Sequence, residues 1–288
     1  MMFSYLSRMT TSMLKRLTLL LCTVLLSGCG LGGLPVALER SIMDHPDPAL
    51  VSSAVPAYLL MLDTLVANDP EDSAMNAAAA KLYAFYATAL DRDATSSARL
   101  ADRSRQYGTT ALCLAEEDTC GIEKLPFAEY RQALQQLDDD VLRELYAFSV
   151  ARLAWLQTHS TDMRALSDLP RVELALQRVL ELDEAYELGA AHLYLGTLKA
   201  LRPPALGGKP QESRAHFERA ILLSGGVDLS YKVAYARYYA RGTFDRELHD
   251  QLLQEVINSE TTGNGRTLIN TLAQSEARQL LESADSYF

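Results

Sequence analysis

The sequence predicts an all-α protein built from helical hairpins that stack as an α-solenoid. Two observations predict this fold class. Between residues 205 and 239, apolar side chains recur at helical spacing, stop at Gly225-Gly226 and then resume, which is typical of two helices joined by a tight turn. Within the first of these helices, the small residue Ala220 follows Phe217 by three positions, a pairing that lets two antiparallel helices approach closely.

The rest of the chain repeats this alternation of apolar stripes and breaks. The pattern is helical over 51–90, interrupted at Asn68-Asp69-Pro70, whose side chains favour capping of the second helix. We expect the last helix to cap the stack, because a terminal repeat must present a polar outer side. The further helices are expected over 96–115, 126–137, 140–158, 171–183, 184–200, 244–257 and 268–287.

The segments 171–183 and 184–200 give the best match to a tetratricopeptide repeat. Leu176, Val179 and Leu182 occupy the apolar positions of the closing helix, and Leu195-Gly196 stands where the repeat has Leu-Gly. The repeat normally closes with proline, whereas this chain has Glu184. We therefore expect tetratricopeptide-like hairpins that are degenerate and irregularly spaced.

Length and composition favour one elongated domain. The chain has 288 residues, of which 48% are hydrophobic, and stacked hairpins share burial between neighbours instead of forming one globule. The formal net charge is −10, and it becomes −13 without residues 1–28, which carry three basic side chains and no acid. Nucleic acid and anionic lipid both require basic surface, so this balance argues against either as a partner.

The first 28 residues have the features of an export signal. Lys15-Arg16 precede an apolar run over 17–26, which is too short to span a bilayer and has the length of a signal-peptide core. The run ends in Leu26-Ser27-Gly28-Cys29, which resembles a bacterial lipobox, and an ordinary cleaved signal with a stray cysteine is the alternative. We expect a lipoprotein signal peptide over 1–28, a lipidated tether over 29–47 and the tetratricopeptide-like domain over 48–288.

Lipidation at Cys29 predicts a periplasmic location. The next residue is Gly30 rather than Asp, so the inner-membrane retention cue is missing, and we expect attachment to the outer membrane through the lipid anchor only. Cys113 and Cys120 would then lie in an oxidising compartment, where two thiols favour one disulfide. Positions seven apart on a straight helix are separated by about 10 Å, so we expect the helix to end between them.

The sequence carries no motif for catalysis, cofactor binding or metal binding. It contains no Gly-x-Ser-x-Gly, no phosphate-binding loop, no dinucleotide-binding glycine pattern and no His-x-x-x-His pair. The five histidines are dispersed along the chain. We therefore predict no catalytic residues, no metal site and no cofactor, and the residues by themselves indicate an exported helical protein that binds a partner.

Four segments follow one another behind the lipobox: ALGGKPQESRAHFERAILLSGG, YKVAYARYYA, FDRELHDQLLQEVI and LINTLAQSEARQLL. Together they resemble the T-component family of tripartite ATP-independent periplasmic (TRAP) transporters, and the resemblance extends over 50–288. It implies a lipoprotein that assembles as a homotrimer, with a pore or cavity in each protomer. It also implies docking of a periplasmic solute-binding protein and passage of a hydrophobic or organic-acid ligand towards the permease. Of the family's functional residues, only the lipidated cysteine maps onto this chain, at Cys29.

The helix after the double glycine contains a candidate ligand site. Tyr231, Tyr235 and Tyr238 lie about one turn apart, with Lys232 and Tyr239 beside them, so one face would present aromatic walls and a cation to a carboxylate. Packing between repeats is the simpler interpretation of these tyrosines.

Two functions from different classes remain open. The first is a transporter accessory subunit that binds a solute-binding protein and a ligand. The second is a lipid-anchored scaffold for envelope protein assembly, which predicts a concave protein-binding groove without a pore. Genes for a solute-binding protein and a permease nearby would favour the first. An enzyme is a weaker third, because no motif pairs a nucleophile with a base.

Overall fold

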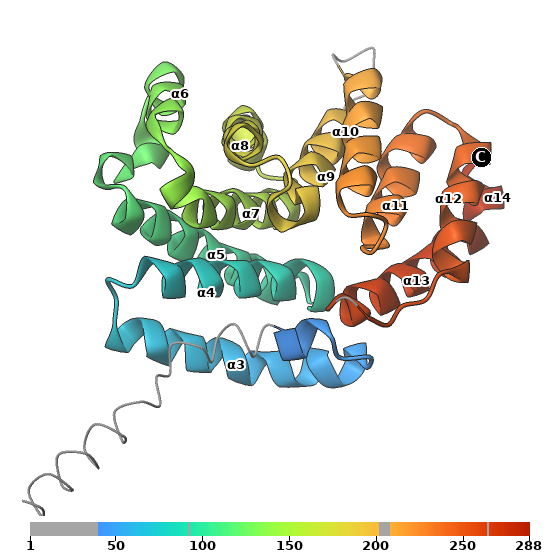
Figure 1. Ribbon diagram of the computed structural model, residues 1–288, viewed down its shortest axis with the longest axis horizontal. Helices are drawn as coiled ribbons and strands as arrows, with labels where there is room; N and C mark the ends of the chain where they lie inside the picture. The colour runs from blue at the N-terminus through green and yellow to red at the C-terminus, as the bar shows by residue number, and fades with distance from the viewer. Residues whose placement is uncertain (1–39, 92, 202–207, 264) are drawn as a thin grey trace, which may run out of the picture. The chain divides into compact units, whose positions relative to one another are not determined.

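The computed structural model describes residues 40–91, 93–201, 208–263 and 265–288, most of which are helical (Figure 1). Contacts divide the chain after Arg40, and the unit described below is Ser41–Phe288. No strand occurs among the described residues, which confirms the all-α prediction. The α-helices are α3 (Pro48–Asn68), α4 (Ser73–Phe85), α5 (Ala94–Ala115), α6 (Phe127–Gln136), α7 (Leu142–Thr158), α8 (Met163–Leu182), α9 (Tyr186–Ala200), α10 (Pro210–Leu223), α11 (Ser230–Ala234), α12 (Arg246–Asn258), α13 (Thr267–Glu282) and α14 (Ala284–Tyr287).

An aspartate side chain caps the amino-terminal end of many of these helices. In each case the carboxylate stands before the helix and accepts a backbone N–H of its first turn, a donor that has no partner within the helix. At α5, for example, Asp93 accepts the N–H of Ser96 at 2.7 Å. The aspartates that cap in this way are Asp47, Asp72, Asp93, Asp162 and Asp245.

Helices α4, α5 and α7 pack closely against one another. Small residues line their shared faces and let the helix axes approach. Gly108 of α5 lies so near α7 that a Cβ at this position would be 3.0 Å from the Cβ of Ala151 and 3.1 Å from the Cα of Phe148. One turn earlier on α5, the hydroxyl of Ser104 donates to the carbonyl of Ala80 in α4 at 2.7 Å. These contacts fix α5 between its two neighbours.

The chain continues through α8, α9 and α10, each packed on the one before, and then through α11, α12 and α13 (Figure 1). The contact between α9 and α10 is again close, because Gly196 faces the ring of Phe217. A Cβ at Gly196 would lie only 3.1 to 3.3 Å from ring carbons. Phe217 is fully buried, so the residue that marked this hairpin in the sequence lies in its core.

Helix α3 is long and apolar enough to cross a membrane by length and composition, with a mean hydropathy of 1.7. In the structure it packs against α4 and α13 instead. The segment before it also reaches α13, because the hydroxyl of Thr267 donates to Asp44 at 2.6 Å. The side chains that α3 buries are Val51, Val55, Leu59, Leu62 and Val66.

Helices α8 and α9 begin differently from the sequence expectation. Helix α8 begins at Met163 rather than at 171 and runs through Pro170. Proline lacks a backbone N–H, so the helix loses one hydrogen bond at Pro170. The helix nevertheless starts earlier, because Asp162 caps its amino-terminal end by accepting the N–H of Arg164 at 2.8 Å. Helix α9 begins with a turn of left-handed residues, Glu187 to Gly189. Apolar periodicity assumes a regular right-handed helix, so it does not reveal such a turn.

Candidate functional site

The tyrosine-rich segment predicted to bind a ligand consists of α11 and a π-helical turn, Tyr235–Ala240. A π-helical turn contains more residues than an α-helical one, so side chains spaced for one α-helical face are rotated apart. Tyr231 and Tyr235 are both buried, but in different places. The ring of Tyr235 stacks on Phe217 at 5.1 Å, whereas the Tyr231 hydroxyl donates to the carbonyl of Glu187 at 3.3 Å.

The other residues of this segment also have partners. Lys232 Nζ lies 2.7 Å from the carboxylate of Glu255. The ring of Tyr239 lies 5.2 Å from that of Tyr235, and Tyr238 is partly buried against the same hydrophobic cluster. Tyr231 belongs to a different cluster. The structure thus divides the predicted site residues between two cores, and their part in ligand binding stays a prediction.

The left-handed turn at the start of α9 is the most strained backbone among the described residues. Glu187, Leu188 and Gly189 have φ angles of 49°, 61° and 75°. Glycine adopts such angles freely, whereas each non-glycine residue there costs about 1 to 3 kcal/mol. A Cβ at Gly189 would in addition lie 2.8 Å from the side chain of Leu223. The turn places the carboxylate of Glu187 next to the cations of Lys81 and Arg266.

A central polar cluster surrounds this turn and consists of Lys81, Glu187, Asp228 and Arg266. The Glu187 carboxylate lies 3.2 Å from Lys81 Nζ and 3.7 Å from a terminal nitrogen of Arg266, whose other terminal nitrogen is 3.6 Å from Asp228. Asp228 is only 3% exposed. Burial raises the pKa of Asp228, while hydrogen bonds from Ser230 and the charge of Arg266 oppose that rise. The cluster therefore ties together α4, α9 and the loops before α11 and α13.

The cysteine predictions concern two separate regions. A disulfide joins Cys113 and Cys120, whose Cα atoms are 4.5 Å apart, and α5 ends between them at Ala115. Cys29, the signal peptide and the tether up to residue 39 lie outside the described residues. Within the described ranges, no group of three or more His, Cys, Asp or Glu side chains is arranged to hold a metal ion.

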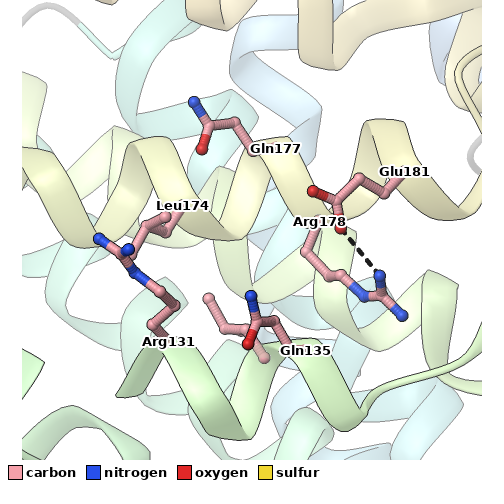
Figure 2. Close-up of a pocket in the computed structure, with 7 residues that line it drawn as sticks. Arg131, Gln135, Leu174, Gln177, Arg178 and Glu181 are labelled. Carbon is pink, nitrogen blue, oxygen red and sulfur yellow. Dashed lines mark hydrogen bonds and ion pairs between the residues drawn. The ribbon is translucent and has the colours of Figure 1, made fainter. Parts of the chain in front are cut away.

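A pocket of about 280 Å³ lies between α6 and α8 (Figure 2). We refer to it as the α6–α8 pocket. Its volume is near the lower end of the range for small-molecule sites. Side chains from both helices surround it, and most of them are polar (Figure 2). The lining residues are Arg131, Leu134, Gln135, Leu174, Gln177, Arg178 and Glu181.

Three side chains of this pocket have hydrogen-bond donors that no described residue accepts. Arg131 has no ion pair with any described residue, and its guanidinium lies over the ring of Phe127 at 5.4 Å. The amides of Gln135 and Gln177 likewise have no hydrogen bond within the described part of the chain. These donors remain available to water or to a ligand.

The opposite wall of the pocket holds a second guanidinium. Arg178 pairs with Glu181 at 2.8 Å and also donates to the backbone carbonyl of Leu137, which fixes its position. Two cations against one carboxylate give the pocket a positive balance. A carboxylate ligand suits such a donor set, because it accepts several hydrogen bonds and pairs bidentately with arginine.

Sequence reasoning missed the α6–α8 pocket for a topological reason. Arg131 and Gln135 are four residues apart, so helical spacing alone places them on one face. The same holds for Gln177 and Glu181 on the next but one helix. Nothing in the sequence pairs these two faces, because α7 lies between α6 and α8 along the chain.

Comparison with known proteins adds the family. A family model described as TRAP transporter T-component matches residues 44–288, which includes every helix from α3 to α14. A comparison with curated proteins finds no match. The resemblance read from four segments of the sequence is thus confirmed over nearly the whole chain, which belongs to the TRAP transporter T-component family.

Proposed function

We propose that this protein is an accessory subunit of a TRAP transporter and that it docks the transporter's periplasmic solute-binding protein. The match of residues 44–288 to the T-component family carries the proposal. Members of this family are transporter components, and the family is not one of enzymes. A T-component implies association with other TRAP subunits, and the solute-binding protein is the one that shares the expected compartment.

In this proposal the mature protein lies in the periplasm and is attached to the outer membrane by lipid on Cys29. The lipobox and the following Gly30 support this location. The Cys113–Cys120 disulfide also supports it, because disulfides persist in oxidising compartments.

The finer architecture belongs to the same proposal. Helices α7 to α10 pack on one another in sequence order, and the contact of Gly196 with Phe217 pairs a small residue with a large one, as tetratricopeptide hairpins do. We therefore interpret the unit as a degenerate tetratricopeptide-like solenoid. The family resemblance further implies a homotrimer.

An organic acid is the ligand class that the α6–α8 pocket favours. Arg131, Gln135 and Gln177 offer donors without competing partners among the described residues, and Arg178 adds a second guanidinium. A carboxylate bound there would gain charge-assisted hydrogen bonds. The volume of about 280 Å³ restricts the ligand to a small acid. The segment from Tyr231 to Tyr239 remains the alternative location for the ligand.

Native mass spectrometry tests the role of the protein. The mature chain is measured alone and then with its candidate solute-binding protein. We expect a trimer whose mass increases by that of the bound solute-binding protein. A monomer that does not bind this protein would contradict the accessory role and would favour the envelope scaffold.

Isothermal titration with succinate tests the ligand class. Arg131→Gln should weaken succinate binding about tenfold, because a hydrogen bond to a charged group contributes roughly 1.5 kcal/mol. Arg164→Gln is the matched control, since this exposed arginine at the start of α8 pairs with Asp162 outside the pocket. It should leave the affinity unchanged.

A matched compound completes this test. Succinamide has the same chain as succinate but two neutral amides in place of its carboxylates. We expect succinate to bind and succinamide not to. Equal affinities, equal losses in the two variants, or no binding of millimolar succinate would contradict a carboxylate site in the α6–α8 pocket.

A further inference from the structure

Helix α3 has an outer face without any charged side chain. Every exposed position of the helix is apolar or neutral. Leu60 is 68% exposed and Leu50 is 53% exposed, although both are large apolar residues. Positions three and four apart are neighbours on a helix, so these side chains form one continuous patch. The residues that define the outer face of α3 are Leu50, Ser53, Ala57, Leu60, Met61 and Thr64.

The rest of α3 is fixed to the protein. Its single charged residue, Asp63, is turned inward and accepts the hydroxyl of Tyr83 in α4 at 2.9 Å and that of Tyr107 in α5. Arg103 lies 3.7 Å from the same carboxylate. The opposite face packs against α4 (Figure 1). Helix α3 is therefore held in the folded unit, and its outer face stays exposed unless a partner covers it.

Another surface helix of the same unit, α10, exposes charged side chains to solvent. Helix α10 has ion pairs along its outer side, from Lys209 to Glu212 at 2.8 Å and from Arg214 to Glu218 at 2.8 Å. Its exposed Leu222 lies beyond them. Charged residues on the outward face are the usual pattern for a solvated helix. The outer face of α3 lacks them, which indicates an apolar partner.

We propose that the outer face of α3 rests on the lipid bilayer that anchors the protein. This proposal rests on the lipid anchor of the proposed function and adds a second membrane contact to it, because α3 is the first long helix of the described residues. Fewer than twenty residues separate Cys29 from Pro48, and even a fully extended chain of that length spans at most roughly 65 Å, so α3 stays near the anchored end of the chain. The helix is about 30 Å long. Lying flat, it buries its outer face at the boundary between headgroups and acyl chains.

The lipid that fits this face is zwitterionic. The outer face offers no cation to an acidic headgroup, and the exposed acids Asp47, Asp69 and Glu71 lie just beyond the two ends of the helix. Anionic lipid would repel these acids, whereas neutral headgroups would not. Contact then depends on apolar burial and not on charge, so salt should change it little. A second copy of the chain is the competing occupant.

A fluorophore placed on the outer face tests the proposal. The dye NBD is attached to Leu60→Cys or to Leu222→Cys, because these two leucines have nearly equal exposure, 68% and 67%, and only Leu60 lies on the outer face. The acylated protein is reconstituted into phosphatidylcholine–phosphatidylethanolamine vesicles that contain spin-labelled lipid. We expect the lipid to quench the dye at position 60 several-fold more than at 222. Equal quenching would overturn the proposal, and a blue-shifted but unquenched dye at 60 would assign the face to a protein neighbour.

A second form of the protein separates this proposal from the lipid anchor. The chain from Gly30 with an amino-terminal polyhistidine tag is held on vesicles by nickel-chelating lipid, without acylation. Stronger quenching at 60 than at 222 in this form would support the outer face even if the mass of the mature protein showed no acyl chains. Equal quenching at the two positions in the acylated protein would reject contact between the outer face of α3 and lipid, and it would not count against the lipid anchor.

Discussion

Two regions of the helical unit are held together by different means. Where α5 packs on α7 beside Gly108, the contact is made by the fully buried apolar residues Ala147, Phe148 and Ala151, and the missing side chain of Gly108 lets the helices approach. Around Glu187, by contrast, the packing includes the charges of the central polar cluster, of which Asp228 is buried and the other three are partly exposed. An apolar contact needs only complementary shape, whereas a buried charge such as that of Asp228 also needs a partner in place. Adding side-chain volume should therefore destabilise the first region, and removing an ion-pair partner should destabilise the second.

A large side chain at Gly108 should cause the greatest loss of stability, because it disrupts the apolar contact between α5 and α7. In Gly108→Leu, the new Cβ would lie 3.1 Å from the Cα of Phe148, a backbone atom that cannot rotate away. Helices α5 and α7 must separate, so we expect the free energy of unfolding to fall by about 3 kcal/mol. Urea unfolding followed by circular dichroism measures this loss.

Gly242→Leu is the matched control. A Cβ at Gly242 would have no neighbour within 4 Å. We expect its free energy of unfolding to stay within about 0.5 kcal/mol of the parent value. Losses of similar size at both positions would mean that leucine acts through the helix itself and not through the contact between α5 and α7.

The apolar region is also the part that the sequence predicts well. Its helices follow from the period of the apolar residues, and the breaks between them follow from capping aspartates and glycines. The close approach at Gly196 is readable from the Leu-Gly pair and from Phe217 on the next helix. Each of these signals is local, because a hairpin joins segments that are neighbours along the chain. The close approach of Gly108 to α7 is not local, since α6 lies between α5 and α7 along the chain, and the sequence did not predict it.

The central polar cluster is different, because its signals are not local. Lys81 and Glu187 come together across 106 positions of the sequence. Glu187 and Leu188 are not residues that favour positive φ, so only Gly189 hinted at the left-handed turn. The α6–α8 pocket was missed for a similar reason, since it needs the packing of two helices that are not consecutive. Periodicity predicts which faces are buried, but not which distant faces meet.

The second prediction breaks the central polar cluster. Arg266→Met removes the cation 3.6 Å from Asp228 and leaves that buried carboxylate without its ion-pair partner. We expect the free energy of unfolding at pH 7 to fall by about 2 kcal/mol. Adding Asp228→Asn to this variant removes the unpaired charge and should restore part of the loss. If the double variant is as unstable as the sum of the two single ones, the two residues are not coupled.

The stability of Arg266→Met should also depend on pH differently from that of the parent protein. Burial already raises the pKa of Asp228, and Arg266 opposes that rise, so removing Arg266 raises the pKa further. A carboxyl whose folded pKa lies above its unfolded value binds a proton more tightly in the folded state. The variant should therefore regain stability relative to the parent as the pH falls from 7 towards 5. An unchanged difference between the two proteins over this range would contradict it.

A histidine pair between α9 and α10 extends the comparison to neutral side chains. His192 and His216 approach to 2.7 Å through their Nδ1 atoms, and the other ring nitrogen of His192 lies 3.0 Å from Glu184. Burial lowers the pKa of His216 to about 4, and the charges of His192 and Lys199 add to this, while Glu212 opposes it. Burial also lowers the pKa of His192, against the effect of Glu184. The folded protein therefore holds the ring of His216 neutral near pH 6.

The smallest of these effects follows from that pair. A histidine whose folded pKa lies below its unfolded value stabilises the fold at high pH, and this contribution is lost as the pH falls below about 6.5. For His216 we expect a loss of about 1 kcal/mol between pH 7 and pH 5.5, after allowance for its partial contact with water. His216→Gln should flatten the stability profile over this interval, whereas His45→Gln, in the segment before α3, should keep it. A parallel decline in all three proteins would mean that acid acts elsewhere, and that the contact between α9 and α10 depends on shape, as the contact between α5 and α7 does.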